Sequence, residues 1–286
     1  MDKQYPSPIN DFVFKKIFTK NLDVLKAFLT AALPDIDPDE FESVTLLDPT
    51  LEPEYAEDKL GVLDIKILTR SRKVINVEVQ VRPQRALWKR SLFYASGMVV
   101  EQLKKGDPYE NISSVISIVI TDFVVRPDRK AYRSRFRMYD VSDGEQYPET
   151  FEIHILELPK MRSSDGTALG DWMLFFNART RGEFMEVAKK CPAIGKAWAT
   201  VEYLSGDARE KAMARLMEKV HRDRISQMHD SLMDGVELGM QRGRMETQYD
   251  IARSLLRMKI PFDGIADATG LPLAEVNRLA AEQDAL

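Results

Sequence analysis

The stretch GVLDIKILTRSRKVINVEVQV, residues 61 to 81, constrains the fold most, because it predicts two strands joined by a short charged turn. Apolar and polar residues alternate in both halves, which is typical of strands with one buried face. If the turn is centred on Ser71, Asp64 lies opposite Glu78 on the polar face. The sequence therefore predicts an antiparallel hairpin in which two carboxylates meet across neighbouring strands.

Two carboxylates that face each other in this way need a compensating positive charge. Like charges directly opposite each other destabilise a sheet by up to about 1 kcal/mol, and by more when they are desolvated. Lys66, which faces Asn76 in the same register, is one candidate. A divalent cation such as Mg²⁺ is the stronger candidate because it prefers oxygen ligands. The alternative is a hairpin with one solvated face, and a register shift of one residue would reverse the two faces.

The segments around the hairpin predict a mixed α/β domain. Residues 10–33 carry apolar residues at helical spacing after a capping residue, Asn10 or Ser7. Residues 85–106 predict a long amphipathic helix that ends at lysines and a glycine. The run SVISIVITDF is nearly continuous in β-branched residues, which is typical of a strand buried on both faces. Further strands are predicted at 131–141 and 150–158.

The pattern after residue 165 is helical. Glycines at 235, 239 and 243 are spaced four apart on a helical pattern, which either lets two helices approach closely or marks a mobile linker. Predicted helices cover residues 167–178, 181–190, 193–204 and 207–236. We therefore expect three parts: an α/β domain at 1–165, a helical region with the glycine-spaced helix at 166–250, and a small helical module at 251–286.

Composition narrows the kind of chemistry. With 286 residues, 44% of them hydrophobic, the chain can bury a full core. The single cysteine, Cys191, excludes a disulfide framework, and three scattered histidines leave carboxylates as the main reactive groups. No apolar run is long enough to span a bilayer and the N-terminus lacks a secretory pattern, so we expect a cytoplasmic protein that does not contact a membrane. The net charge of −4 argues against non-specific coating of nucleic acid but permits a local basic patch.

The order of the motifs resembles a known family. A helix with DFVFKKIF, strands with LDIK and NVEVQ, a helix with WKRSLFYAS and the segment GDPYENISSVISIVITDF follow one another within residues 8–123. This ordered set resembles the PD-(D/E)XK nuclease superfamily and, more narrowly, the Rpn family of recombination-promoting nucleases, which are also described as transposases. The resemblance implies an α/β, restriction-endonuclease-like fold: a mixed sheet flanked by helices, followed by an all-α C-terminal region.

The resemblance also implies roles for residues of the hairpin. Asp64 and Glu78 would bind the metal ion. Gln80 stands where the wider superfamily has a lysine that orients the attacking water. Because a glutamine cannot supply a positive charge, Lys66 on the same face is a candidate for that part.

For two further residues, Asp11 and Arg90, the sequence leaves more than one role open. Asp11 lies in line with two phenylalanines of its helix, so we expect it to point inward. It would then either reach the metal site as an outer carboxylate or only stabilise the helix N-terminus. Arg90 lies between Trp88 and Tyr94 on its helix, and it would hold a phosphate, orient Glu78, or form a structural contact with an aromatic ring.

Two features are candidates for contact with nucleic acid. Arg133, Arg135 and Arg137 share one strand face, which either follows a phosphate backbone or forms a solvated outer face. The end of the chain has a helix–turn–helix pattern whose second helix carries Arg278 among several acidic residues, so a protein partner suits it at least as well as DNA. The small, turn and anchoring residues of this pattern are Ala266, Gly270 and Val276.

These features favour a Mg²⁺-dependent DNA endonuclease that hydrolyses phosphodiester bonds with a metal-activated water, with Mn²⁺ as a substitute ion. We expect DNA as the partner, no nucleotide cofactor, and a homodimer or higher homo-oligomer, since two cuts need two sites. One alternative is a non-catalytic nucleic-acid-binding or regulatory protein that uses the helix–turn–helix. Another is a structural oligomer built on the glycine-spaced helix, which leaves the pairing of Asp64 and Glu78 unexplained.

Overall fold

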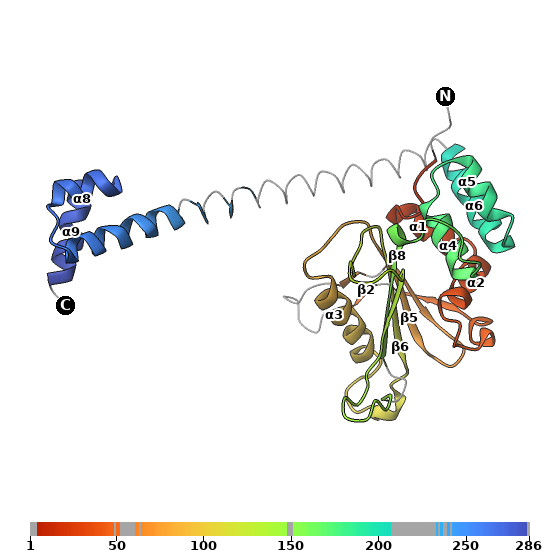
Figure 1. Cartoon of the computed structure of the whole chain (residues 1–286). Coiled ribbons are helices and arrows are strands. Elements are labelled where there is room, and N and C mark those ends of the chain that lie inside the picture. The colour runs from red at the N-terminus through yellow and green to blue at the C-terminus, as the bar shows by residue number, and fades with distance from the viewer. Residues whose placement is uncertain are drawn as a thin grey trace. The chain divides into compact units, whose positions relative to one another are not determined.

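The chain forms two compact units, Met1–Glu218 and Lys219–Leu286, and each is described by itself (Figure 1). The structure is a computed structural model. The residues that it describes are 5–48, 50–51, 61–62, 64–147, 151–206, 233, 235–236, 239–240 and 242–284. Leu63 and most of the predicted helix at 207–236 therefore lie outside the described residues.

A six-stranded mixed sheet forms the centre of the first unit (Figure 1). Its strand order is β1–β4–β5–β6–β8–β7, in which β5, β6 and β8 are parallel and the other neighbours are antiparallel. A separate antiparallel pair joins β2 to β3. The strands are β1 (Thr45–Leu47), β2 (Thr50–Leu51), β3 (Gly61–Val62), β4 (Ile65–Leu68), β5 (Val74–Gln80), β6 (Val115–Thr121), β7 (Arg133–Phe136) and β8 (Phe151–Glu157).

The β4–β5 hairpin has the predicted register. Lys66 pairs with Asn76, and Ile65 pairs with Val77. The isoleucines and valines of one face join the main hydrophobic core, and the polar residues of β5 lie on the other face. The alternation of apolar and polar residues therefore places the carboxylate of Glu78 away from the main core.

Helices cover both faces of the sheet. The main core packs α1, α2, α4, α5 and α6 against one face, and α3 packs on β6 and β8 of the other face (Figure 1). Every residue of β6 is buried, which confirms that this strand is covered on both sides. The α-helices of this unit are α1 (Asp11–Thr19), α2 (Leu22–Ala32), α3 (Leu87–Val100), α4 (Ala168–Asn177), α5 (Arg181–Ala188) and α6 (Pro192–Gly206), and the short 3₁₀ turns are η1 (Pro38–Phe41), η2 (Tyr109–Asn111) and η3 (Leu158–Lys160).

The segment predicted as one helix at 10–33 forms two helices. Asn10 caps α1, as predicted, because its side chain accepts hydrogen bonds from the backbone N–H groups of Phe12 and Val13. Asn21 starts α2 in the same way by accepting from the N–H of Asp23. A second capping residue inside an apolar pattern thus divides the helix without changing which residues are buried.

The change from strands to helices falls where the sequence predicts it, between the end of β8 and the start of α4. The helices that follow share the main core with the N-terminal helices: Trp172 of α4 contacts the rings of Phe18 and Phe28. The division of the chain into three parts at 165 and 250 stays a prediction.

The second unit contains a small helical core. Residues 242–257 are helical and pack with α8 (Phe262–Thr269) and α9 (Leu273–Asp284). Gly270 ends α8 with a φ of 72°, a conformation that favours glycine, and Val276 is fully buried. The turn and the anchor therefore lie where the helix–turn–helix pattern predicts them. None of the described helices is long and apolar enough to cross a membrane.

Candidate active site

Asp64 and Glu78 lie together on the face of the hairpin that α3 covers. Asp64 directly precedes β4, and its Oδ2 accepts a hydrogen bond of 2.8 Å from the backbone N–H of Val79 on β5. The side chains of Asp64 and Glu78 are 17% and 5% exposed. The hairpin therefore brings two carboxylates into one largely buried place.

Both carboxyl groups resist ionisation. Burial, together with the nearby charges of Asp11 and Glu78, raises the pKa of Asp64 to about 7, against the opposing effects of the Val79 N–H and Lys15. Burial also raises the pKa of Glu78, although Arg90 and neighbouring amides oppose this rise. The neighbouring cations Lys15 and Arg90 therefore do not offset the effect of burial on either carboxyl group.

Lys15 of α1 provides a positive charge beside Asp64. Its Nζ lies 3.0 Å from Asp11 Oδ1 and 3.5 Å from Asp64 Oδ1. Although partial burial lowers it, the pKa of Lys15 is raised overall by these two carboxylates. Lys15 is absent from the residues predicted for the site; the i, i+4 spacing of Asp11 and Lys15 is the sequence signal that points to it.

The prediction that Asp11 points inward is wrong. Its side chain is 55% exposed, although it lies on the same side of the helix as Phe14 and Phe18. Side chains tilt toward the N-terminus of a helix, so a residue in the first turn leans past the packed part of the helix. Asp11 still acts on the site, because its charge raises the pKa of Asp64.

Arg90 of α3 meets both of its predicted partners. Its Nη2 donates to Glu78 Oε1 at 3.2 Å, and its guanidinium carbon lies 4.7 Å from the centre of the Tyr94 ring. Gln80 also donates its amide to Glu78 Oε1, and Gln84 donates to Gln80 Oε1 at 2.9 Å. Glu78 is therefore held from two sides by groups of β5 and α3.

Lys66 does not contact Asp64 or Glu78, as a residue that orients the attacking water would. Its ammonium group forms an ion pair with Glu101, which directly follows α3. Both side chains are largely buried, at 10% and 24% exposed. The structure thus brings Lys15, rather than Lys66, into contact with a carboxylate of the hairpin pair.

Two arginines of the predicted row, Arg135 of β7 and Arg137 directly after this strand, are paired with carboxylates. Arg135 Nε lies 2.9 Å and Arg137 Nη2 lies 2.7 Å from the buried Glu152, whose Oε2 also contacts His154 Nε2 at 2.9 Å. Arg135 additionally pairs with Asp35. These two arginines are neither solvated nor available to follow a phosphate backbone.

The helix–turn–helix is formed, but Arg278 of its second helix is paired with acidic residues. Arg278 lies 2.6 Å from Glu275 Oε1 and also pairs with Glu282, both on its own helix. Tyr249 donates its hydroxyl to Glu275 at 2.8 Å. This surface is therefore poorly suited to read DNA.

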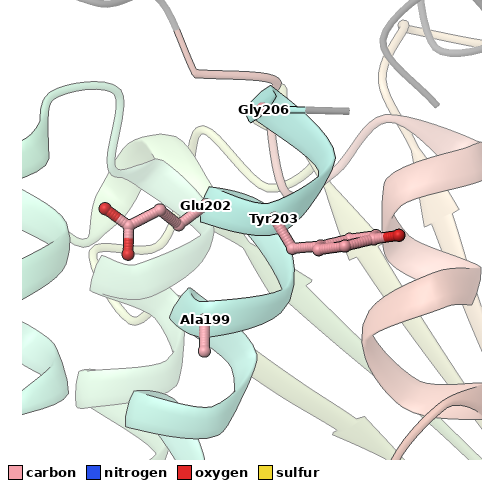
Figure 2. A pocket seen from close by; sticks show the side chains of 4 residues that line it. All are labelled: Ala199, Glu202, Tyr203 and Gly206. Carbon is pink, nitrogen blue, oxygen red and sulfur yellow. The ribbon is translucent and has the colours of Figure 1, made fainter. Parts of the chain in front are cut away.

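A surface pocket of about 540 Å³ lies on α6 and contains none of the predicted site residues. Figure 2 shows Glu202 and Tyr203, two of its lining residues, directed to opposite sides of the helix. Glu202 lies 3.7 Å from Arg181 of α5, and Lys20 lies over the Tyr203 ring. Because no polar groups converge there, the pocket is not a candidate active site.

The donor set of the hairpin fits a divalent cation. Among the described residues, no three His, Cys, Asp or Glu side chains are grouped closely enough to form a complete metal cage. Mg²⁺ does not need such a cage, since it commonly takes one or two carboxylates and completes its shell with water and substrate oxygens. Asp64 and Glu78, whose pKa values are raised mainly by burial, supply that pair.

Comparison with known families agrees with the fold and with the ordered motifs. A family model described as PD-(D/E)XK nuclease family transposase matches residues 8–231, which include the entire sheet and the hairpin carboxylates. No curated protein and no solved structure gives a significant match. The mixed sheet with flanking helices confirms the predicted restriction-endonuclease-like fold. Because the matched residues make up well over half of its length, the chain belongs to the PD-(D/E)XK nuclease family transposases.

Proposed function

We propose that this protein is a Mg²⁺-dependent DNA endonuclease and that Asp64 and Glu78 hold the metal ion. The observation that carries the proposal is a pair of largely buried carboxylates with raised pKa values, Asp64 directly before β4 and Glu78 on the adjacent strand β5. Unbalanced buried charge of this kind is costly to a fold and is typical of functional sites. Membership of a nuclease family supports the same conclusion, because such nucleases generally use divalent metals.

The surrounding residues fix the two carboxylates. When bound, Mg²⁺ lowers the pKa of a water molecule and offsets the charge that develops on the phosphate. The N–H of Val79 holds Oδ2 of Asp64, so Oδ1 is the oxygen that faces Lys15. Arg90 and Gln80 both donate to Oε1 of Glu78, which leaves Oε2 as the oxygen for a cation. Each carboxylate thus has one oxygen held by hydrogen bonds, and Lys15 lies beside the second oxygen of Asp64.

Lys15 is our candidate for the positive charge that Gln80 lacks. Its ammonium group touches Asp64, whereas that of Lys66 pairs with Glu101. We propose that Lys15 steadies negative charge beside Asp64 during cleavage. The alternative, in which Lys66 orients the attacking water, is tested with Lys66→Met. Full nuclease activity of this variant would exclude that role for Lys66.

DNA is the substrate that family membership implies, and we propose that the chain acts as a homodimer or higher oligomer. The non-catalytic alternative, in which the helix–turn–helix binds DNA, is not favoured because Arg278 is paired with two glutamates of its own helix.

A nicking assay tests the proposal. Supercoiled plasmid is incubated with the intact chain and with Asp64→Ala, each in Mg²⁺, Mn²⁺ or Ca²⁺. We expect nicking by the intact chain in Mg²⁺ and Mn²⁺, and none by the variant. Equal nicking by both chains, or DNA retention without cleavage in any metal, would refute a role for Asp64 in catalysis.

A further inference from the structure

The outward surface of α3 carries large apolar side chains that nothing in the described residues covers. Leu92 is 52% exposed, Phe93 is 55% exposed and Val100 is 71% exposed. Trp88 is 41% exposed and contacts the Phe136 ring edge-on, with 5.1 Å between the ring centres. One helix of a folded unit therefore presents two aromatic rings and two aliphatic side chains to solvent, which in a soluble protein often marks a binding surface.

Free positive charge accompanies this apolar surface. No Asp or Glu occurs between Glu78 and Glu101, although the net charge of the chain is −4. Arg82, Arg85 and Lys89 fall in this stretch, and none of the three has an ion-pair partner among the residues that the structure describes. Arg135 and Arg137, in contrast, are paired with carboxylates. These three residues are therefore cations beside α3 that remain available for an external anion.

The same segment is fastened to the candidate active site. Gln84 donates to Gln80, and Arg90 of α3 donates to Glu78, so both the loop before α3 and the helix itself contact β5 next to the carboxylates. The Phe93 ring lies 5.9 Å from the Tyr94 ring, over which Arg90 packs. A ligand on this surface would therefore adjoin Glu78.

We propose that α3, together with the loop before it, is a binding surface for single-stranded DNA: Phe93 and Trp88 stack on unpaired bases, while Arg82, Arg85 and Lys89 contact the phosphates. Unpaired bases expose flat apolar faces next to a charged backbone, which matches a surface of aromatic rings and free cations. A duplex hides these base faces and offers only phosphates to such a surface. The inference rests on the proposed nuclease function, and it names single-stranded or locally unpaired DNA as the substrate class.

A second copy of this chain is the competing occupant of an apolar helix surface. Three unpaired cations within eight residues would repel the same surface on another copy if the two met symmetrically, whereas they attract a polyanion. Charge therefore favours DNA over self-association at this surface.

Fluorescence of Trp88 provides a direct measurement. The chain has three tryptophans, and the other two, Trp172 and Trp198, are 1% and 8% exposed. Oligothymidylate is titrated into the full chain carrying Glu78→Gln, without metal, so that binding is observed without cleavage. We expect quenching of the exposed tryptophan, and we expect Trp88→Phe in the same background to remove the signal while retaining binding.

Two variants separate stacking from charge. Phe93→Leu should weaken oligothymidylate binding about tenfold and leave binding of a duplex of equal length unchanged, because stacking needs an exposed base face. Arg85→Gln should weaken binding of both DNAs and lower the salt dependence of single-strand affinity by about 0.7 in the logarithmic slope. Phe262→Leu in the second unit and Arg70→Gln at the β4–β5 turn are the matched controls, with no expected change.

The results distinguish single-stranded DNA from a second copy of the chain as the ligand of the α3 surface. Unchanged single-strand affinity in Phe93→Leu, or equal losses for single strand and duplex, would overturn the inference. So would conversion of an oligomer to a monomer by Phe93→Leu with DNA binding intact. Absence of Mg²⁺-dependent nicking by the unmodified chain, with single-strand binding that depends on Phe93, would refute the proposed nuclease and leave the α3 surface in place.

Discussion

Glu78 and Glu152 are buried carboxylates of the same sheet, yet their surroundings differ in kind. Glu78 on β5 lies under α3 and receives one arginine contact, from Arg90 at 3.2 Å. Glu152 on β8 contacts Arg135 at 2.9 Å, Arg137 at 2.7 Å and His154 at 2.9 Å. One carboxylate is left partly unbalanced, and the other is surrounded by cations and hydrogen-bond donors.

Their pKa values move in opposite directions. Burial raises the pKa of Glu78, because Arg90, Gln80 and Asn76 together do not offset it. Burial also acts on Glu152, but His154 and Arg135 hold its pKa below the ordinary range. Burial alone therefore does not distinguish a structural carboxylate from a functional one; the distinction lies in how completely the protein balances the charge.

The largest expected effect separates activity from stability at Glu78. Glu78→Gln keeps the size and one acceptor for Arg90 but removes the charge that would hold Mg²⁺. We expect plasmid nicking to fall at least about a thousandfold, since a bound metal contributes several kcal/mol to the transition state. The free energy of unfolding, measured in urea, should stay the same or rise, because an unbalanced buried charge is removed. Full nicking by this variant would contradict the assignment.

At Glu152 we expect a loss of stability with little change in nicking. Glu152→Gln leaves Arg135 and Arg137 without their shared carboxylate, which should cost about 3–5 kcal/mol of unfolding free energy. Nicking by the folded fraction should remain within about twofold of the unmodified chain. A Glu152→Gln chain that is stable but does not nick plasmid would show that Glu152, and not only Glu78, is a functional carboxylate.

The pH dependence of stability sharpens the comparison at Asp64. Its folded-state pKa of about 7 exceeds the ordinary value of 3.8, so protonation favours the folded state. The stabilisation is complete below about pH 4 and is lost as pH rises through 7. The loss of unfolding free energy between these pH values is at most about 4 kcal/mol. We expect about half of this loss, because the structure relaxes around the charged group.

Thermal unfolding without metal, from pH 4 to 8, measures this loss. Asp64→Asn can still accept the Val79 N–H and should flatten the curve, so that the variant is more stable than the unmodified chain at pH 8. The exposed Asp23→Asn serves as the control and should leave the slope unchanged. An unchanged slope in Asp64→Asn would show that another group titrates.

The smallest expected effect concerns Lys15. Lys15→Met should lower single-turnover nicking about ten- to a hundredfold, as removal of a positioning group near a metal site commonly does. Mg²⁺ affinity measured by calorimetry should not fall, because Lys15 and the cation compete for Asp64. Lys16→Met on the same helix is the matched control. A loss of Mg²⁺ affinity in Lys15→Met equal to the loss of nicking would argue against this role.

Local sequence rules worked where neighbouring residues decide the outcome. The hairpin register followed from the turn position and the alternation of side chains, and the cap at Asn10 followed from residue type. The same rules failed for Asp11, which the helical spacing placed inward. They also failed for Arg135 and Arg137, whose carboxylate partners Asp35 and Glu152 come from other segments.

The sequence by itself determined the strand pairing that brings Asp64 to Glu78, because a period of two and a short turn leave few registers with one buried face. Only the tertiary structure decided which cations accompany them. Lys15 and Arg90 arrive from helices on either side of the hairpin in sequence, while Lys66, a closer neighbour in the chain, pairs with Glu101. Charge compensation depends on distances of a few ångströms between segments that are far apart in the chain. The spacing of residues within one segment does not predict those distances.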